Sequence, residues 1–171
     1  MAKVRDYVPD YAVMAHRGST FWAPEETESA WRWAREMGAD YLESDLQCTK
    51  DGVILANHDD NLKRTTNIEN VYSELVPATR KAFYMRHGMS EAEAEKLVAA
   101  DKASFRPYYA MSYMYEELLA LDAGSWFNET SIEQARESFS EQHQYISALE
   151  DQIRYAEGKM LARDADGERI Y

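Results

Sequence analysis

The sequence has one cysteine, few positive charges and no long apolar run, and each shortage excludes a class of protein. Cys48 alone can form neither an internal disulfide nor a zinc site built from several cysteines. Nineteen lysines and arginines stand against 31 acidic residues. The resulting net charge of −12 argues against nucleic acid and anionic membrane surfaces as partners. No run of roughly 18 apolar residues occurs, so no transmembrane helix is predicted.

The first residues, "MAKVRDYVPDYAVMAH", contain neither the apolar stretch nor the small-residue cleavage site of a secretory signal. We therefore expect a cytoplasmic location if Met1 is the natural start. A hydrophobic content of 45% excludes a disordered chain. A length of 171 residues suits one domain with a sizeable core.

Three short apolar runs in the first third predict strands over Tyr11–Ala15, Asp40–Gln47 and Gly52–His58. A helix between the first two runs is indicated by Pro24 at its start and Gly38 at its end. Strand, helix and strand with short connections predict a parallel βαβ unit, to which the third strand is added as a parallel neighbour. The predicted buried face of the helix consists of Ala30, Trp31, Trp33, Ala34 and Met37.

The middle of the chain, from about 70 to 113, shows no clear strand and reads as an inserted helical subdomain. Ser90–Ala100 is predicted as a helix with a serine cap. The segment and its borders are rich in aromatic residues, namely Tyr84, Phe105, Tyr108, Tyr109, Tyr113 and Tyr115. Further helices are predicted over Tyr115–Gly124 and Ser131–Lys159. The apolar face of the second would contain Phe139, Ile146, Leu149 and Ile153.

Glu43 and Asp45 stand two residues apart in the second predicted strand, and alternate residues of a strand share a face. Two neighbouring carboxylates repel each other unless one is protonated or a cation lies between them. Oxygen ligands alone suit Mg²⁺ or Ca²⁺ better than Zn²⁺. A solvated face of an edge strand is the alternative interpretation.

His16 and Arg17 follow the first predicted strand, and His58 and Asp59 follow the third. Active sites of parallel α/β folds form where the strands end. We therefore expect His16, Arg17, His58 and the Glu43–Asp45 pair to face one crevice. Two proton-transfer groups, a hard-cation site and an arginine together suit cleavage of a phosphate ester.

The segment "AHRG…APEETESAW…GADYLESDLQCTKDGVILANHDDNLKRTTN" resembles the glycerophosphodiester phosphodiesterase family. The corresponding family motifs are HRG, PENT, a Glu-x-Asp strand, T-K-D-G, and H-D followed by R-T-T-N. "LLALDAGSWF" and "ISALEDQIRYA" also resemble family segments, so the likeness extends from about residue 11 to 157 without the insertion. The resemblance implies an α/β fold of the parallel TIM-barrel type. It also implies hydrolysis of glycerophosphodiesters to glycerol 3-phosphate and an alcohol.

The resemblance also assigns roles, residue by residue. His16 and His58 would be the acid/base pair, and Glu43 and Asp45 would bind a divalent cation, Ca²⁺ or Mg²⁺. Arg17 would contact the phosphate of a small-molecule phosphodiester, and Glu25 would line the same pocket.

Other residues carry weaker signals. Four further residues are charged or aromatic candidates: Trp22, Lys50, Lys63 and Arg64. Each has either a minor role at the pocket or an ordinary role, in packing for Trp22 and as a surface charge for the others. Cys48 is predicted to be buried, and His87 and His143 to lie on the surface.

Two features depart from the family pattern. Glu26 stands where the family has asparagine. The strand with an E-x-K pattern, which supplies a third acidic ligand in the family, has no counterpart here. Because a barrel of eight strand–helix units needs roughly 250 residues, residues 1–171 would be the N-terminal part of one, with an insertion at about 70–113. Three interpretations stay open: a fragment of a phosphodiesterase, a stand-alone remnant that has lost catalysis, and a binding or assembly module that uses the aromatic insertion as an interface.

Overall fold

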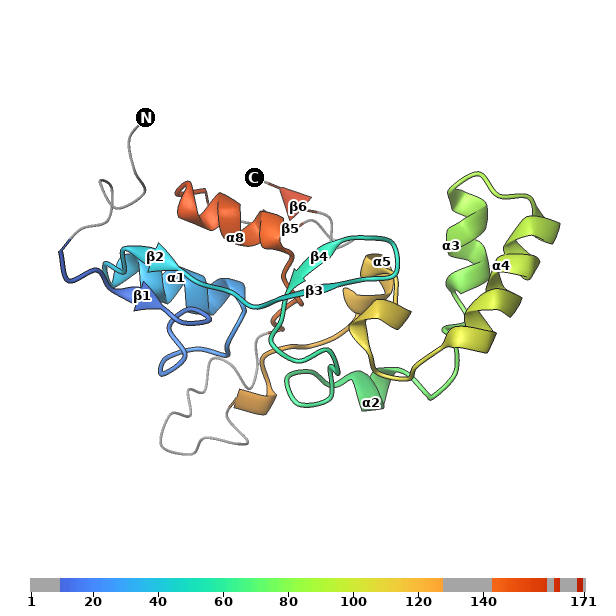
Figure 1. The fold of residues 1–171 in the computed structure, drawn as a ribbon, viewed down its shortest axis with the longest axis horizontal. Helices are drawn as coiled ribbons and strands as arrows, with labels where there is room; N and C mark the ends of the chain where they lie inside the picture. The colour runs from blue at the N-terminus through green and yellow to red at the C-terminus, as the bar shows by residue number, and fades with distance from the viewer. Residues whose placement is uncertain (1–9, 128–142, 160–161, 164–168, 171) are drawn as a thin grey trace.

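The computed structural model describes residues 10–127, 143–159, 162–163 and 169–170. The first elements of the described chain form an α/β unit. Strand β1 (Met14–Ala15) pairs in parallel with β2 (Tyr41–Leu42), as predicted, and helix α1 (Glu28–Glu36) connects them. The Thr27 side chain caps α1 by accepting the Ala30 N–H at 3.3 Å. The first part of the predicted βαβ unit is therefore present (Figure 1).

The buried face of α1 is narrower than predicted. Ala30, Trp31 and Ala34 are buried, whereas Trp33 is 44% and Met37 59% exposed. The prediction was wrong for these two residues because they flank the stripe that α1 turns toward its neighbours. The Trp33 ring instead stacks on that of Trp22, with 6.1 Å between their centres.

The third predicted strand runs in the opposite direction to the one expected. Strands β3 (Leu46–Cys48) and β4 (Ile54–Ala56) form an antiparallel hairpin. Only five residues, 49–53, connect them, and a parallel crossover needs a dozen or more. The prediction of three neighbouring parallel strands was therefore wrong. Cys48, predicted to be buried, is exposed at the end of β3.

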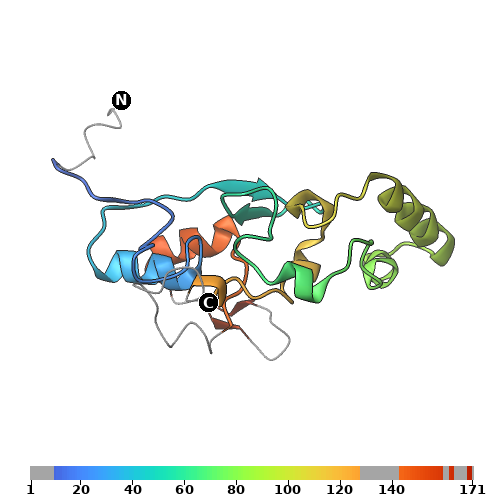
Figure 2. The same ribbon diagram turned by 90° about the horizontal axis from the view of Figure 1, so that it is seen from below.

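The region around the predicted insertion is helical in the structure. Its elements are α2 (Ile68–Val71), α3 (Arg80–Arg86), α4 (Glu91–Ser104) and the 3₁₀ turn η2 (Ala110–Ser112). A capping box between Ser90 and Glu93 begins α4, which confirms the serine cap. Figure 2 shows the α3–α4 pair projecting at the end of the molecule opposite to α1.

The aromatic side chains of this region contribute to the core. Tyr113 is fully buried, and Phe105, Tyr108 and Tyr115 pack against the same cluster. The buried members of this largest cluster are Leu55, Leu62, Ile68, Ala110, Tyr113, Leu118, Leu121, Ala123 and Ile146. The aromatic residues thus anchor the region to the hairpin.

The last described helices are shorter than predicted. Helix α5 covers Tyr115–Leu118, and α8 covers Leu149–Ala156. Residues 128–142, including Phe139, lie outside the described residues. Ile153 is 50% exposed, against the prediction, while Tyr155 packs with Trp31 of α1 and Ala56 of β4.

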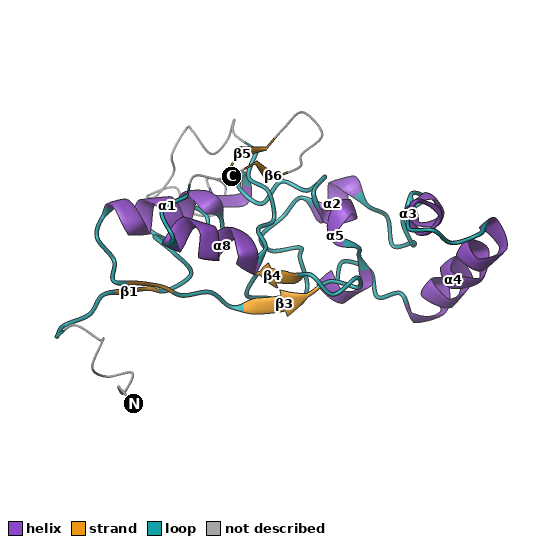
Figure 3. Ribbon diagram, turned by 90° about the horizontal axis from the view of Figure 1, so that it is seen from above, coloured by secondary structure: helices purple, strands orange, loops and turns teal. Residues whose placement is uncertain are grey.

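Figure 3 shows α1 and α8 on the same side of strands β1, β3 and β4. The antiparallel pair β5 (Ala162–Arg163) and β6 (Arg169–Ile170) follows α8 along the chain. None of the helices in the described part of the chain is long and apolar enough to cross a membrane.

Candidate active site

The turn after β1 fixes the position of the first candidate residues. Gly18 has φ +88°, and a Cβ at this position would lie 2.6 Å from the Cβ of Ala30. The Gly18 N–H donates to the Ala15 carbonyl at 3.1 Å, which closes the turn. Glycine is therefore required both for the backbone conformation and for the close approach to α1. This turn places Arg17 against the residues that follow β2.

Arg17 brings three predicted site residues together. Its backbone N–H donates to Oε2 of Glu43 at 2.9 Å, and its Nη1 donates to Oε1 of Glu25 at 3.3 Å. Its Nε lies 2.8 Å from Oδ2 of Asp45. The Arg17 side chain is only 18% exposed. One arginine thus contacts carboxylates from the β1–α1 loop and from the segment between β2 and β3.

Glu26 is a buried neighbour of the Arg17 group and is only 4% exposed. Its Oε1 accepts the backbone N–H of Asp45 at 2.7 Å. Burial raises the pKa of the Glu26 carboxyl to about 7, although the hydrogen bonds from Ser44 and Asp45 act in the opposite direction. A proton is therefore held on this carboxyl over a wider range of pH than on an exposed one.

His58 follows β4 and belongs to a second group of charged side chains. Its Nδ1 lies 2.5 Å from Oδ1 of Asp59, and Nε of Arg64 donates to the other Asp59 oxygen at 2.6 Å. Arg64 also donates through Nη2 to Oε1 of Glu25 at 2.6 Å. The hydrogen bond from Arg64 is the main cause that lowers the pKa of Asp59. Glu25 therefore joins the His58 group to the Arg17 group.

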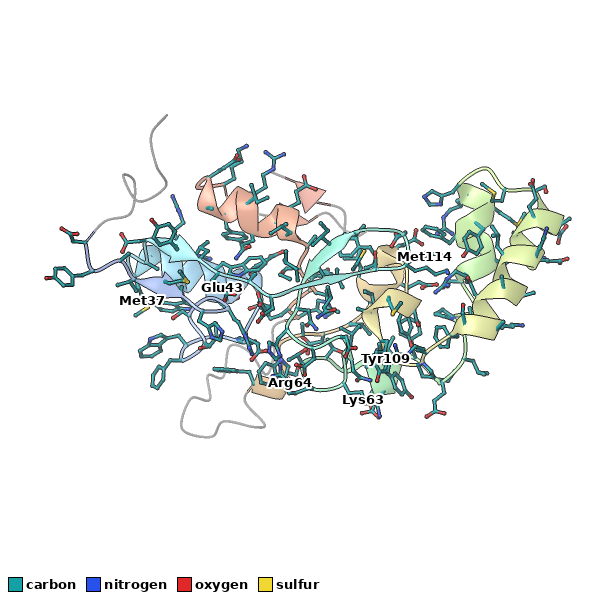
Figure 4. The ribbon with its side chains drawn as sticks, viewed as in Figure 1. Met37, Glu43, Lys63, Arg64, Tyr109 and Met114 are labelled. Atoms are coloured by element: carbon teal, nitrogen blue, oxygen red, sulfur yellow. The ribbon has the colours of Figure 1, made fainter. Side chains whose placement is uncertain are left out.

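The structure brings together most of the predicted site. Arg17, Glu25, Glu43 and Asp45 are in direct contact, and His58 reaches them through Asp59 and Arg64. His16 is exposed in the same turn as Arg17. The predicted location at the ends of three parallel strands was wrong for His58, because its strand is antiparallel to β3. Figure 4 shows that Glu43 and Arg64 both lie well away from the α3–α4 pair.

The weaker candidates have other neighbours. Lys50 pairs with Asp101 and Lys63 with Glu69, each at 2.9 Å. Trp22 is half-buried against Trp33, in agreement with a packing role. His87 and His143 are exposed, which confirms the prediction of surface positions.

Sequence reasoning missed the structural importance of Arg64 and of Asn57. The Asn57 N–H donates to the Asp45 carbonyl at 2.9 Å, and its side chain contacts both Asp59 and Thr65. The "RTTN" motif, residues 64–67, was the signal that could have identified Arg64. A motif that is shared with a family and follows a site histidine indicates residues that hold the local structure of the site. Arg64 is 43% exposed, as a surface charge would be, but its contacts with Glu25 and Asp59 were not predicted.

The carboxylates of Glu43 and Asp45 are candidate ligands for a divalent cation. Their oxygen chemistry fits a hard cation such as Ca²⁺ or Mg²⁺. Within the described residues, however, no group of three His, Cys, Asp or Glu side chains is placed to hold a metal ion. Arg17 also stands next to Asp45. Glu43 and Asp45 therefore suit part of a cation site and do not complete one.

The profile of the "Glycerophosphoryl diester phosphodiesterase family" matches residues 16–169. The chain belongs to this family. The sequence is 31% identical over 126 residues to a glycerophosphodiester phosphodiesterase of Bacillus subtilis, covering 74% of this chain and 30% of that protein. The resemblance inferred from the motifs is thereby confirmed.

Two solved structures of phosphodiesterases are similar to this chain. The crystal structure of the Agrobacterium tumefaciens glycerophosphodiester phosphodiesterase has a TM-score of 0.52 and 26% identity, covering 86% of this chain and 43% of that one. An Oleispira antarctica phosphodiesterase, solved in complex with the product sn-glycerol-3-phosphate, has a TM-score of 0.56 and 24% identity. The match covers 90% of this chain and 42% of that one. The α/β fold class is confirmed, and the chain spans less than half the length of each of these three family members.

Proposed function

We propose that this chain supplies a glycerophosphodiesterase site that hydrolyses glycerophosphodiesters to glycerol 3-phosphate and an alcohol. The observation that carries the proposal is the contact of Arg17 with Glu25, Glu43 and Asp45. These residues come from three separate motifs, namely the HRG, PENT-like and Glu-x-Asp motifs. An arginine beside a carboxylate pair, together with His16 and His58, is a set of groups that suits phosphodiester hydrolysis.

In this proposal His16 and His58 exchange protons with the attacking water and the leaving alcohol. Arg17 pairs with a phosphate oxygen through its guanidinium, which has the fork geometry that suits phosphate. Glu25 holds Arg17 and Arg64 in place through one shared oxygen. Glu43 and Asp45 would hold a divalent cation together with ligands from water or from outside the described residues. Such a cation would polarise the phosphoryl group when bound.

The same proposal extends to the architecture. Residues 1–171 would form the N-terminal part of a TIM-barrel domain, with the helical segment at about 70–113 as an insertion. The α/β unit formed by β1, α1 and β2 supports it, since a parallel strand–helix–strand unit is the repeating element of such barrels.

An inactive member of the family that binds phosphodiesters is the second candidate. It is favoured by one observation: within the described ranges, no third acidic or imidazole group joins Glu43 and Asp45 at a metal site. A binding module would retain Arg17 as a phosphate contact without turnover.

Release of glycerol 3-phosphate from glycerophosphocholine, measured with Ca²⁺ or Mg²⁺, tests the proposed activity. The product of the complete gene should be assayed beside its His16→Ala and His58→Ala variants. Each substitution is expected to lower the rate by about 10²- to 10⁴-fold, the usual contribution of a positioned acid or base. His87→Ala is the matched control, because this exposed histidine lies in the helical segment at the end of α3. Unchanged rates in both site variants, or binding without release, would contradict the proposal.

A further inference from the structure

Asp59 contacts a different partner with each of its two carboxylate oxygens. Oδ1 lies 2.5 Å from Nδ1 of His58, and Oδ2 accepts from Nε of Arg64 at 2.6 Å. Arg64 keeps this carboxyl ionised by lowering its pKa. An ionised carboxylate only accepts hydrogen bonds, so the imidazole nitrogen that faces it must carry a proton.

Arg64 is itself held from two further directions. Its Nη2 donates to Oε1 of Glu25 at 2.6 Å, and the same oxygen accepts from Arg17. Its guanidinium carbon also lies 6.0 Å from the centre of the Trp126 ring. The arginine therefore connects the loop after β4 to the loop after β1, which carries His16 and Arg17.

We propose that Asp59 and Arg64 are positioning residues that hold His58 in one tautomer, with the proton on Nδ1. The Nε2 nitrogen is then the one that exchanges protons with a substrate. This inference rests on the proposed function, in which His58 is an acid/base group. It adds the two residues that orient the ring and the tautomer that they select.

Stability of the fold is a poor explanation for this arrangement. The side chains of His58 and Arg64 are 42% and 43% exposed. Ion pairs at this exposure contribute little to folding. The contacts that Asp59 makes with His58 and Arg64 are better explained by orientation of the histidine. The test therefore needs a readout that reports the ring itself.

Nuclear magnetic resonance of the ¹⁵N-labelled 171-residue chain, at a pH where the histidines are neutral, gives that readout. Long-range ¹H–¹⁵N correlations distinguish a protonated Nδ1 from a protonated Nε2, and a His58→Gln variant assigns the signals. The wild-type chain should show His58 protonated on Nδ1. In Asp59→Ala and Arg64→Met the signals should move toward a mixture of the two tautomers. Asp59→Asn, which retains an acceptor oxygen, should keep more of the wild-type pattern.

Two controls accompany these variants. Lys63→Met removes a neighbouring cation that pairs with Glu69 rather than Asp59, and it should leave the His58 signals unchanged. His87 is an internal reference, because its Nδ1 lies 2.9 Å from the Phe83 carbonyl and so carries a proton. Retention of the His87 signals shows that a variant has folded, and Arg64→Met replaces Asp59→Ala if the latter has not.

A proton on Nε2 of His58 in the wild-type chain would overturn the inference. So would an Nδ1 proton that persists in both Asp59→Ala and Arg64→Met. The measurement needs no turnover, so it is separable from the proposed function. If the tautomer behaves as expected while His58→Ala retains full activity, the positioning contacts stand and the acid/base role of His58 falls.

Discussion

The guanidinium of Arg17 lies beside Asp45, with 2.8 Å between Nε and Oδ2. Asp45 is one of the two carboxylates proposed to bind a divalent cation, and the backbone N–H of Arg17 holds the other, Glu43. The arginine thus both organises the carboxylates and neutralises part of their charge. In the proposed function, a cation that binds here would compete with Arg17, which would then be available to a phosphate oxygen.

Replacement of Arg17 by methionine should separate these two effects. We expect Arg17→Met to bind Ca²⁺ more tightly, by roughly fivefold, because a competing positive charge worth on the order of 1 kcal/mol is removed. Release of glycerol 3-phosphate should fall in the same variant, since the proposed contact of Arg17 with the phosphate would be lost. Calorimetric titration with Ca²⁺ measures the first effect.

The control for Arg17→Met is Arg32→Met. Arg32 is an exposed residue of α1 that pairs with Glu36, so its removal changes the net charge equally at a distance from the site. Equal Ca²⁺ affinities in the two variants would show that Arg17 does not compete for Asp45.

Local sequence patterns allowed much of the first forty residues to be predicted. Features that depend on contacts between distant parts of the chain were not predicted. Pro24 and Gly38 correctly indicated a helix. Glu43 and Asp45 both contact Arg17, but they lie between β2 and β3 rather than within the single strand predicted over Asp40–Gln47. The predicted direction of β4 was wrong because the apolar pattern of a strand does not indicate its direction. The short connection through Gly52 was the signal for an antiparallel hairpin. The role of Arg64 was missed because its contact with Glu25 spans 39 positions in sequence.

Glu26 should make stability depend on pH. Its pKa is raised from 4.5 to about 7, chiefly by burial, so the folded chain binds this proton more tightly than the unfolded chain. The free energy of unfolding should therefore fall as the pH rises from about 5 to 7, and the loss should persist above that range. Glu26→Gln should remove this slope and stabilise the protein at pH 8, by up to about 3 kcal/mol. Urea unfolding at several pH values, with a chelator present, measures it.

Glu36→Gln is the matched control for Glu26→Gln. Glu36 is an exposed carboxylate of α1, so the same chemical change there should leave the pH dependence of the wild-type chain intact. A Glu26→Gln variant whose stability still falls between pH 5 and 7 would show that another group is responsible.

Arg80 should be essential for the attachment of the α3–α4 pair. It is fully buried and donates to Asp101 at 2.7 Å, to both oxygens of Glu117, and to the Ser112 carbonyl. Arg80→Met would leave the buried carboxylate of Glu117 without its cation, whereas Asp101 would retain Lys50 at 2.9 Å. Breaking such a buried pair from one side costs about 3–5 kcal/mol. Urea unfolding should show this loss. Arg86→Met, at an exposed arginine of α3 that pairs with Glu116, should cost about 1 kcal/mol or less. Similar losses in both variants would argue against a special role for the buried network.

The 171-residue chain should bind Ca²⁺ weakly and release little or no glycerol 3-phosphate. Its described residues offer Glu43 and Asp45 but no third acidic or imidazole ligand placed with them. An ion held by two carboxylates must complete its coordination with water, and Mg²⁺ in particular needs a near-octahedral set of ligands. We expect Ca²⁺ dissociation constants of about 10⁻⁴ M or weaker, in the range of low-affinity sites. Calorimetry on the wild-type chain and on Asp45→Asn, which should bind still more weakly, tests the site. Micromolar Ca²⁺ binding together with robust turnover would show that these two carboxylates, with Arg17 beside them, are sufficient.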